Sequence, residues 1–359
     1  MNYEEFKAEL DSLNISYKEN FILAPLTTWK VGGPAKIFIE LNDIEKAKST
    51  IRLSYKTNLP VFVMGGGSNI LISDEGFDGI VLKNQLTGIE ITKDTAKNNT
   101  QEKFEENAKA RLIQVDKKNY YSFDEFNYDE SEYDRVLVKV YSATLLSFTI
   151  NNLIQNGITG LQWFAGIPGT IGGAIYNNIH GGTHFFSEYI EEVDLINHKG
   201  EIETIKSHEL GLDYDFSKIQ SSKNFILSVK LKLFKGDKQR AQKTAVEWSQ
   251  VKRLKQPYNS AGCCFKNITN EELSKTDFLS SGWGYIIEHK LGLKGFTHNG
   301  AQISTKHAAF IENIGNAKAE DIMYLLELIY KTAKEKINIT PKTEIFFVGF
   351  PKDRIEKFQ

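Results

Sequence analysis

The fold is decided by the stretch Val61-Phe62-Val63-Met64-Gly65-Gly66-Gly67-Ser68-Asn69, in which an apolar strand runs directly into three glycines. Adjacent glycines allow main-chain N–H groups to converge on an anion, and Ser68 and Asn69 add side-chain donors. A dinucleotide pyrophosphate suits such a loop. The spacing is neither the Rossmann fingerprint nor a P-loop, because Ile70 follows and no Gly-Lys-Ser/Thr does. A plain glycine turn between strands stays open as the alternative.

A second glycine-rich run begins about 100 residues later and reads Gly166-Ile167-Pro168-Gly169-Thr170-Ile171-Gly172-Gly173-Ala174. Its four glycines and one proline fix a backbone path that can approach a flat or phosphorylated group closely. Taken alone, this run could be a packed loop. Two such loops, each after strand-like sequence, together predict a large bound cofactor.

Outward from these loops, helical and strand patterns alternate, so the expected fold class is α+β. Helices are expected over residues 2–14, 42–57, 145–156, 240–254 and 319–336. Strands are expected over residues 35–40, 61–64, 70–72, 79–82, 136–140, 189–197, 200–205, 225–234 and 343–349.

The pattern is lost from about residue 92 to residue 135, where polar and acidic runs alternate with aromatic residues. A connection this long is unusual inside a compact domain, so we interpret it as an inserted surface segment with a weak local fold. The expected division is a first domain over 1–236 that carries this insertion, a second over 237–342, and a terminal strand and tail over 343–359 that return to the first.

The composition excludes several protein classes. The chain has 359 residues, 41% of them apolar and 25% charged, with a formal net charge of −2 and a pI near 6.4. These values exclude collagen-like, low-complexity and disulfide-scaffold chains, and they argue against nucleic acid or an anionic membrane as a partner. The two cysteines are adjacent and imply no disulfide framework. With no visible signal peptide or membrane span, we expect a soluble cytoplasmic protein.

Three further positions carry chemistry. Cys263, beside Gly262, is a thiol with an ordinary pKa of about 8.5, which suits a general acid at neutral pH. Lys266 and Asn267 could hold a sugar phosphate, and Glu344 matters only if its strand returns to the cleft. A buried or solvated structural role is the alternative for each. His180 and His184 are separated by glycines that oppose a helical zinc site, so no metal is expected.

Seven motifs in order resemble the UDP-N-acetylenolpyruvoylglucosamine reductase family, also called UDP-N-acetylmuramate dehydrogenase. They cover nearly the whole chain outside the insertion. The motifs are residues 27–35, 65–71, 166–174, 261–267, 291–295, 300–304 with His307, and 343–349. The resemblance implies a vanillyl-alcohol-oxidase-type (PCMH-type) FAD-binding domain of two α+β subdomains and a smaller α+β substrate domain.

The resemblance also implies roles for individual residues. The two glycine loops would hold FAD non-covalently, because the first has no histidine to which a flavin could be attached. The cofactor-binding residues would be Gly65, Gly66, Gly67, Ser68, Asn69, Ile70, Gly166, Pro168, Gly169, Thr170, Gly172 and Gly173. Cys263 stands where the family carries a serine proton donor, and Glu344 stands at the position of its terminal-strand glutamate. The substrate-binding residues would be Tyr214, Ser217, Arg253, Lys266 and Asn267.

One departure reverses a charge. The family carries Tyr-Arg-x-Ser, whose arginine binds near the flavin and the substrate carboxylate, but this chain reads Tyr214-Asp215-Phe216-Ser217. Lys218, Arg253 and Lys266 are the candidate replacements for that cation. A second segment, Asn178-Ile179-His180-Gly181-Gly182, also differs from the family pattern.

The activity that the resemblance implies is NADPH-dependent, FAD-mediated reduction of UDP-N-acetylglucosamine enolpyruvate to UDP-N-acetylmuramate, in peptidoglycan precursor synthesis. Hydride would reach the enolpyruvyl β-carbon and Cys263 would protonate the adjacent carbon. Two alternatives stay open: another oxidoreductase on the same flavin scaffold, and a diverged FAD- or UDP-sugar-binding protein without turnover. A monomer is expected.

Overall fold

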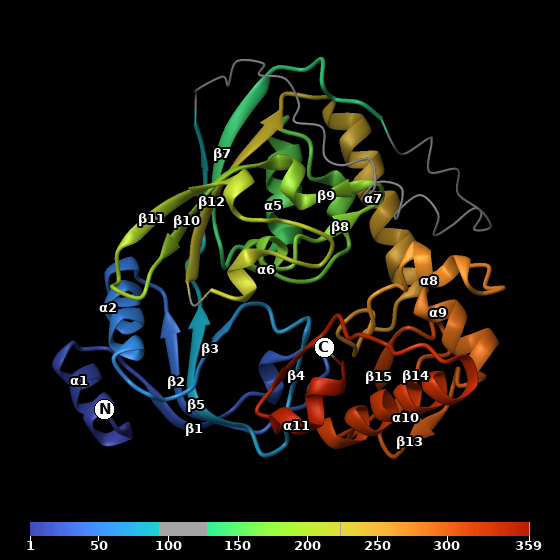
Figure 1. Cartoon of the computed structure of the whole chain (residues 1–359). Coiled ribbons are helices and arrows are strands. Elements are labelled where there is room, and N and C mark those ends of the chain that lie inside the picture. The colour runs from blue at the N-terminus through green and yellow to red at the C-terminus, as the bar shows by residue number, and fades with distance from the viewer. Residues whose placement is uncertain (93–127, 223, 359) are drawn as a thin grey trace.

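The computed structural model describes residues 1–92, 128–222 and 224–358, and Figure 1 shows three main sheets in this part of the chain. In Figure 1 the first sheet along the chain lies at the lower left, the second at the top, and the third beside α10 (Ala319–Ile337) in the orange and red part at the lower right. Among the described residues, no helix is long and apolar enough to cross a membrane.

The first sheet has the strand order β1-β2-β5-β3, with β2, β5 and β3 parallel and β1 antiparallel at the edge. Its elements are α1 (Tyr3–Ser12), β1 (Lys18–Ile22), η1 (Ala24–Leu26), β2 (Pro34–Leu41), α2 (Ile44–Tyr55), β3 (Val61–Met64) and β5 (Phe77–Asn84). Asn2 and Asp43 cap the two helices, accepting hydrogen bonds from the N–H groups of Glu5 and Lys46. Apolar side chains of both helices and the sheet share one core, so β3 delivers the first glycine loop from a rigid base.

The second sheet is antiparallel with the order β11-β10-β12-β7-β6. Its strands are β6 (Ile89–Ile91), β7 (Arg135–Tyr141), β10 (Ile190–Ile196), β11 (Ile202–Lys206) and β12 (Phe225–Phe234). Helices α5 (Leu146–Gln155), α6 (Ile171–Tyr176) and α7 (Lys238–Lys255) pack with it. The same part of the chain contains the two-stranded hairpin of β8 (His180–Gly181) and β9 (His184–Phe185) and the short helices η3 (Gln162–Phe164), η4 (Phe186–Tyr189), η5 (Ser207–Glu209) and η6 (Lys218–Gln220).

The expected insertion ends earlier than predicted. Residues 93–127 lie outside the described residues, but the following stretch is packed into the second sheet's domain. The Tyr128 ring packs tilted against the Trp163 ring, with 4.7 Å between the ring centroids, and the buried Glu130 carboxylate accepts hydrogen bonds from Thr159 and Gln162. The surface interpretation is therefore wrong for Tyr128 and Glu130, because an aromatic contact and buried hydrogen bonds hold them, and β7 already begins at Arg135.

The third sheet, with order β13-β14-β15, packs against α10. The remaining elements of this region are α8 (Asn270–Ser274), α9 (Trp283–Tyr285), the π-helical η7 (Ile286–Leu291), β13 (Thr297–His298), β14 (Ala301–Ile303) and β15 (Ile311–Asn313). Seven fully buried residues of α10, including Ile322, Leu326 and Ile329, face one core with Trp283 and Ile303. That core also contains Trp29 and Leu71, so it continues into the first half of the chain.

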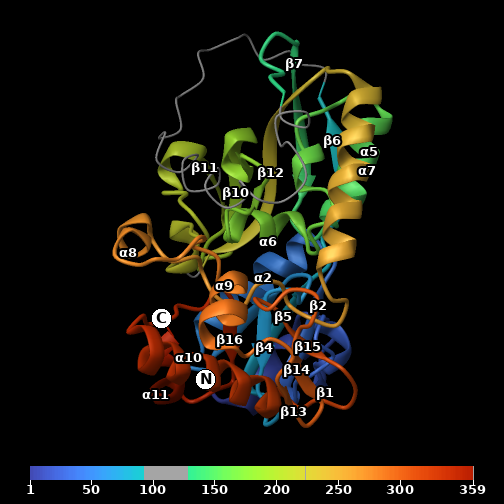
Figure 2. The same ribbon diagram turned by 90° about the vertical axis from the view of Figure 1, so that its right-hand side faces the viewer.

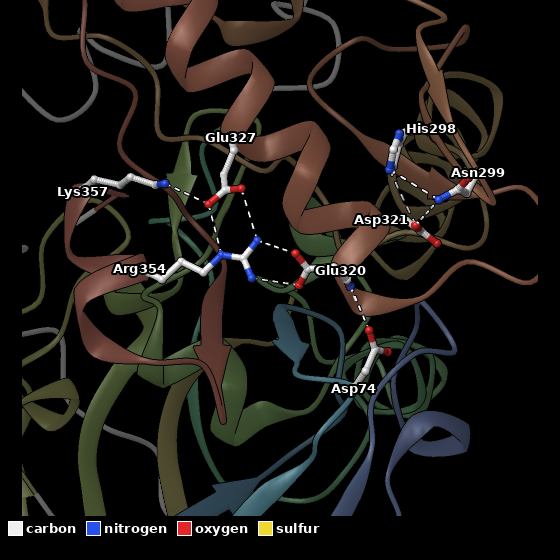
Figure 3. A network of polar contacts seen from close by, with 8 residues as sticks. All are labelled: Asp74, His298, Asn299, Glu320, Asp321, Glu327, Arg354 and Lys357. Carbon is white, nitrogen blue, oxygen red and sulfur yellow. Dashed lines mark hydrogen bonds and ion pairs between the residues drawn. The ribbon is translucent and has the colours of Figure 1, made fainter.

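The C-terminal strand is shorter than predicted and its tail goes elsewhere. β16 (Phe346–Val348) pairs in parallel with β4 (Ile70–Ile72), directly after the first glycine loop. The residues beyond it, α11 (Lys352–Ile355) and η8 (Glu356–Phe358), pack on α10. Arg354 forms ion pairs with Glu320 and Glu327 of that helix (Figure 3).

Helix α7 crosses from one part of the molecule to the other, as both views show (Figures 1 and 2). Its buried residues Ala241 and Ala245 belong to the core of the second sheet. The domain division at residue 236 stays a prediction, and the packing favours a position after α7 instead. Asp74 adds a direct tie, since its carboxylate accepts hydrogen bonds from the N–H groups of Ala319 and Glu320 at the start of α10 (Figure 3).

Candidate active site

The two glycine loops meet in space. A Cβ atom at Gly66 would lie 3.0 Å from the Cα of Gly169, and the Ser68 hydroxyl donates to the Pro168 carbonyl at 3.3 Å. Gly67 has a φ of +69°, and a Cβ there would lie 2.2 Å from the Leu26 carbonyl oxygen. Only glycine fits this backbone, so the loop's shape follows from its sequence. We call residues 65–69 and 166–170 together the glycine cradle.

The first glycine loop has main-chain N–H groups that make no hydrogen bond within the described residues. Within the described residues, no acceptor bonds the main-chain N–H groups of Gly66, Gly67 or Ser68. The Lys83 ammonium, on β5, donates to the Gly65 carbonyl, and burial lowers its pKa. A cation beneath a loop of unbonded N–H groups suits a phosphate. Lys83 was missed at the sequence level, although its place in a strand parallel to β3 was the available signal.

The second loop contributes differently. Thr170 caps α6 by accepting from Gly173, and the Gly172 N–H donates to the Ser142 carbonyl at 2.7 Å. Both N–H groups are therefore used within the fold. The loop's contribution to the cradle comes from Pro168 and Gly169, and Gly166 lies exposed beyond them.

The end of the first loop also positions Glu344. The Asn69 side chain donates to the Glu344 carbonyl at 3.2 Å, and the Asn69 carbonyl accepts from the Phe346 N–H at 3.0 Å. Ile70 then pairs with Phe346 as the first residue of β4. Glu344 lies just before β16 rather than within the strand, which corrects the expected position.

Glu344 and Cys263 are brought together by a short antiparallel crossing. Phe265 forms a bridge with Thr343, and the Glu344 N–H donates to the Cys264 carbonyl at 2.9 Å. Cys264 is fully buried in the core around α10, whereas Cys263 is partly accessible. Burial raises the Cys263 pKa well above its ordinary value, and the negative charge of Glu344 adds to this, so the thiol is protonated at neutral pH.

Two carboxyl groups share this site. Burial raises the pKa of Glu344 well above its ordinary value, the charge of Asp215 raises it further, and Lys266 lowers it. Burial likewise raises the pKa of Asp215 to about 6, against the lowering effect of Lys266. The Lys266 ammonium donates to the Asp215 main-chain carbonyl at 3.4 Å. Of the three candidate cations, Lys266 is the one beside Asp215.

The two departures from the family pattern face each other. Nδ1 of His180, on β8, lies 3.9 Å from Oδ1 of Asp215, and the His180 ring stacks on Tyr214 at 5.2 Å. Sequence reasoning noted both segments but could not place them in contact. The histidines form a short β-hairpin, with no group of metal-ligating side chains among the described residues.

Of the predicted substrate residues, Ser217 is used within the fold and Arg253 lies away from this cluster. Ser217 is fully buried and its hydroxyl donates to the Tyr176 carbonyl at 2.8 Å, so it holds the turn that carries Asp215. Arg253 is exposed and lines a groove of about 290 Å³ between α5 and α7. Its neighbour Lys252 turns inward and donates to the Ala165 carbonyl at 3.0 Å, and burial lowers its pKa to about 7. Lys218 is exposed, and Asn267 is half-buried near Gly282.

This architecture defines an α+β FAD-binding enzyme. Residues 35–100 match the family model described as an FAD binding domain. Residues 254–348 match the model described as the C-terminal domain of UDP-N-acetylenolpyruvoylglucosamine reductase.

The relatives identify the family. UDP-N-acetylenolpyruvoylglucosamine reductase of Clostridium novyi is 32% identical over 92% of this chain and 92% of its own length. The Chlamydia felis reductase is 32% identical over 89% of this chain and 91% of its own. The solved Thermus caldophilus reductase has a TM-score of 0.65 at 24% identity, covering 93% of this chain and 98% of its own. The chain belongs to the UDP-N-acetylenolpyruvoylglucosamine reductase family, and the resemblance and fold class expected from its motifs are confirmed.

Proposed function

We propose that this protein reduces UDP-N-acetylglucosamine enolpyruvate to UDP-N-acetylmuramate with NADPH as the electron donor. The enolpyruvyl double bond gains a hydride at its β-carbon and a proton at the adjacent carbon. The observation that carries the proposal is the meeting of the glycine cradle with the partly accessible, protonated Cys263 and with Glu344. Family membership supplies the substrate class.

The residues present fit FAD. The cradle offers unbonded N–H groups where a side chain would collide with backbone, and the Lys83 cation lies beneath it. We assign Gly65 to Asn69 and the Pro168–Thr170 part of the second loop to FAD binding. When bound, FAD accepts hydride from NADPH and supplies it to the substrate.

Cys263 is the proposed proton donor. Its raised pKa keeps the proton on sulfur until charge develops on the substrate carbon next to the carboxylate. Burial raises the pKa of Glu344 well above its ordinary value, so this carboxyl group is suited to return a proton to the thiolate. Lys266 offsets the negative charge that forms, and Tyr214 and Asn267 are proposed substrate contacts at the same site.

The test is the absorbance spectrum of the purified protein during anaerobic additions. We expect a flavin spectrum that bleaches with NADPH and returns on addition of the enolpyruvyl substrate. Acid denaturation should release the flavin into the supernatant. A colourless protein that takes up no FAD, or a bleached flavin that this substrate does not reoxidise, would contradict the proposal.

The proposal also includes a cytoplasmic monomer, a first domain that ends after α7 rather than at residue 236, and no nucleic-acid or membrane partner. Light scattering after size-exclusion chromatography checks the monomer. Flavin reoxidation by alcohols or sugars in place of the enolpyruvyl ether would favour another oxidoreductase on the same scaffold.

A further inference from the structure

Asp215 is a buried carboxyl group on a backbone built to hold it. It lies at the tip of a turn closed by hydrogen bonds in both directions between Asp213 and Phe216. Its φ is +50°, a left-handed conformation that aspartate tolerates better than most residues. Gln220 and Lys266 both donate to its main-chain carbonyl, at 3.2 and 3.4 Å. These four main-chain contacts fix where this side chain lies.

The carboxyl group itself is nearly without partners. Asp215 is 6% exposed, and its Oδ2 atom has no hydrogen-bond partner within the part of the chain that the structure describes. Oδ1 has only His180 Nδ1, at 3.9 Å, which is beyond hydrogen-bond distance. An unpartnered buried carboxyl group is costly, so a position that retains one points to a ligand that completes it.

The groups that face Asp215 do not neutralise it. Burial and the charge of Lys252 lower the pKa of His180 to about 4, so its ring is neutral. Lys266 contributes charge from the main-chain side, and burial raises the pKa of both Glu344 and Cys263 well above their ordinary values. As the pH falls below neutrality, Asp215, whose pKa is about 6, takes up a proton.

The proposed substrate brings a carboxylate to this cluster. An ionised Asp215 would repel it, whereas a protonated Asp215 offers an O–H donor. We propose that Asp215 binds the substrate carboxylate in its protonated form, donating a hydrogen bond to it, and that one proton enters from solvent as the carboxylate binds. This inference rests on the proposed function, since it assigns a specificity-determining residue to the same site.

The consequence is a proton linkage that depends on the ligand's carboxylate. A second negative charge beside Asp215 raises its pKa above the value in the free protein, so binding near pH 7 takes up a proton. UDP-N-acetylglucosamine lacks the carboxylate and has nothing to receive the hydrogen bond. The two ligands should therefore differ in proton uptake.

The experiment is titration calorimetry of the oxidised, FAD-loaded protein at pH 7 in two buffers of different ionisation enthalpy. The probes are UDP-N-acetylmuramate and UDP-N-acetylglucosamine. We expect uptake of roughly half a proton or more with the first ligand and none with the second. In Asp215→Asn, which keeps a neutral donor, uptake should disappear while the affinity for UDP-N-acetylmuramate changes less than about fivefold.

Controls separate this inference from a structural role and from the proposed function. Asp213→Asn changes an exposed carboxylate on the same turn and should leave the uptake unchanged. If Asp215→Asn does not retain FAD, Asp215→Ser provides a second neutral donor. Equal proton uptake in the wild type, Asp215→Asn and Asp215→Ser, or no proton uptake in the wild type, overturns the inference. If reduced flavin is not reoxidised by the enolpyruvyl substrate at any pH, the proposed function fails instead, and the calorimetric result remains a separate measurement.

Discussion

The glycine cradle and the acid cluster of Cys263, Glu344 and Asp215 lie side by side but are determined by different physics. In the cradle, the lack of space for a side chain restricts the sequence to glycine, because a Cβ at Gly67 would lie 2.2 Å from a carbonyl oxygen. In the acid cluster, the requirement is electrostatic. Asp215 stands where the family has arginine, and the turn around it keeps its main-chain hydrogen bonds. A steric requirement tolerates no substitution, whereas an electrostatic one can be met by a different group with a different protonation state.

The largest expected effect comes from removing space in the cradle. Gly67→Val should abolish FAD binding and yield a colourless protein, because the clash with Leu26 cannot relax without moving the loop. Flavin absorbance of the purified protein measures this. Gly262→Ala is the matched control, since its φ is also positive, +84°, but no atom lies within 4 Å of the added Cβ. That variant should keep its flavin and lose only about 1 kcal/mol of unfolding free energy.

The next effect tests charge and proton supply. Cys263→Ala should slow flavin reoxidation by the substrate about 10²–10⁴-fold, because the proton donor is gone, while NADPH still bleaches the flavin. Stopped-flow absorbance follows both half-reactions. Cys263→Ser should recover most of the rate. Cys264→Ala, in the buried core, should lower the unfolding free energy and leave flavin reoxidation unchanged. If Cys264→Ala slowed flavin reoxidation and Cys263→Ala did not, Cys264 rather than Cys263 would be the proton donor.

A smaller effect appears in stability against pH. Asp215 has its pKa raised to about 6 in the folded state, so between about pH 4 and 6 the folded protein binds more protons than the unfolded chain. Its contribution to stability therefore falls as the pH rises through that window. Asp215→Asn removes the penalty and should raise the unfolding free energy at pH 8, relative to pH 4, by on the order of 2 kcal/mol. Denaturant unfolding at the two pH values measures this, and an unchanged pH dependence would contradict it.

The smallest effect concerns a carboxylate with main-chain partners. Asp74→Ala removes the acceptor for the Ala319 and Glu320 N–H groups and should lower stability by about 1 kcal/mol. Asp43→Ala is the comparison, since Asp43 caps α2 within a single core. Equal losses would show ordinary capping. If Asp74→Ala alone also weakens FAD binding, this cap couples α10 to the cradle, which flavin fluorescence would reveal.

Local patterns predicted much of this molecule. The alternation over Phe225–Phe234 gave strand β12 with its observed limits, and the amphipathic spacing from Ala319 placed α10. The cradle residues and Cys263 were found because glycine and cysteine are chemically distinctive. The buried spacing of Ala241, Ala245 and Trp248 on α7 could also have shown that Lys252, and not Arg253, turns inward.

The rest could not be predicted because it depends on long-range contacts. His180 and Asp215 are 35 residues apart, and no local pattern indicates that a β-hairpin and a turn will face each other. Glu130 and Tyr128 were assigned to a surface insertion because their buried partners, Thr159 and Trp163, come later in the chain. The burial that shifts the pKa values of Glu344 and Asp215 arises from the same tertiary packing.

The hydrogen bond from the Asn69 side chain to the Glu344 carbonyl spans 275 residues of sequence. During translation, the loop that contains Asn69 leaves the ribosome long before Glu344 is made. A nascent chain can therefore form the first sheet and its loop but cannot yet hold the glutamate. Closing so long a loop is among the slowest steps that topology imposes on folding. Glu344 is therefore among the last residues of the candidate active site to be placed, and the site is assembled only after Glu344 has been made.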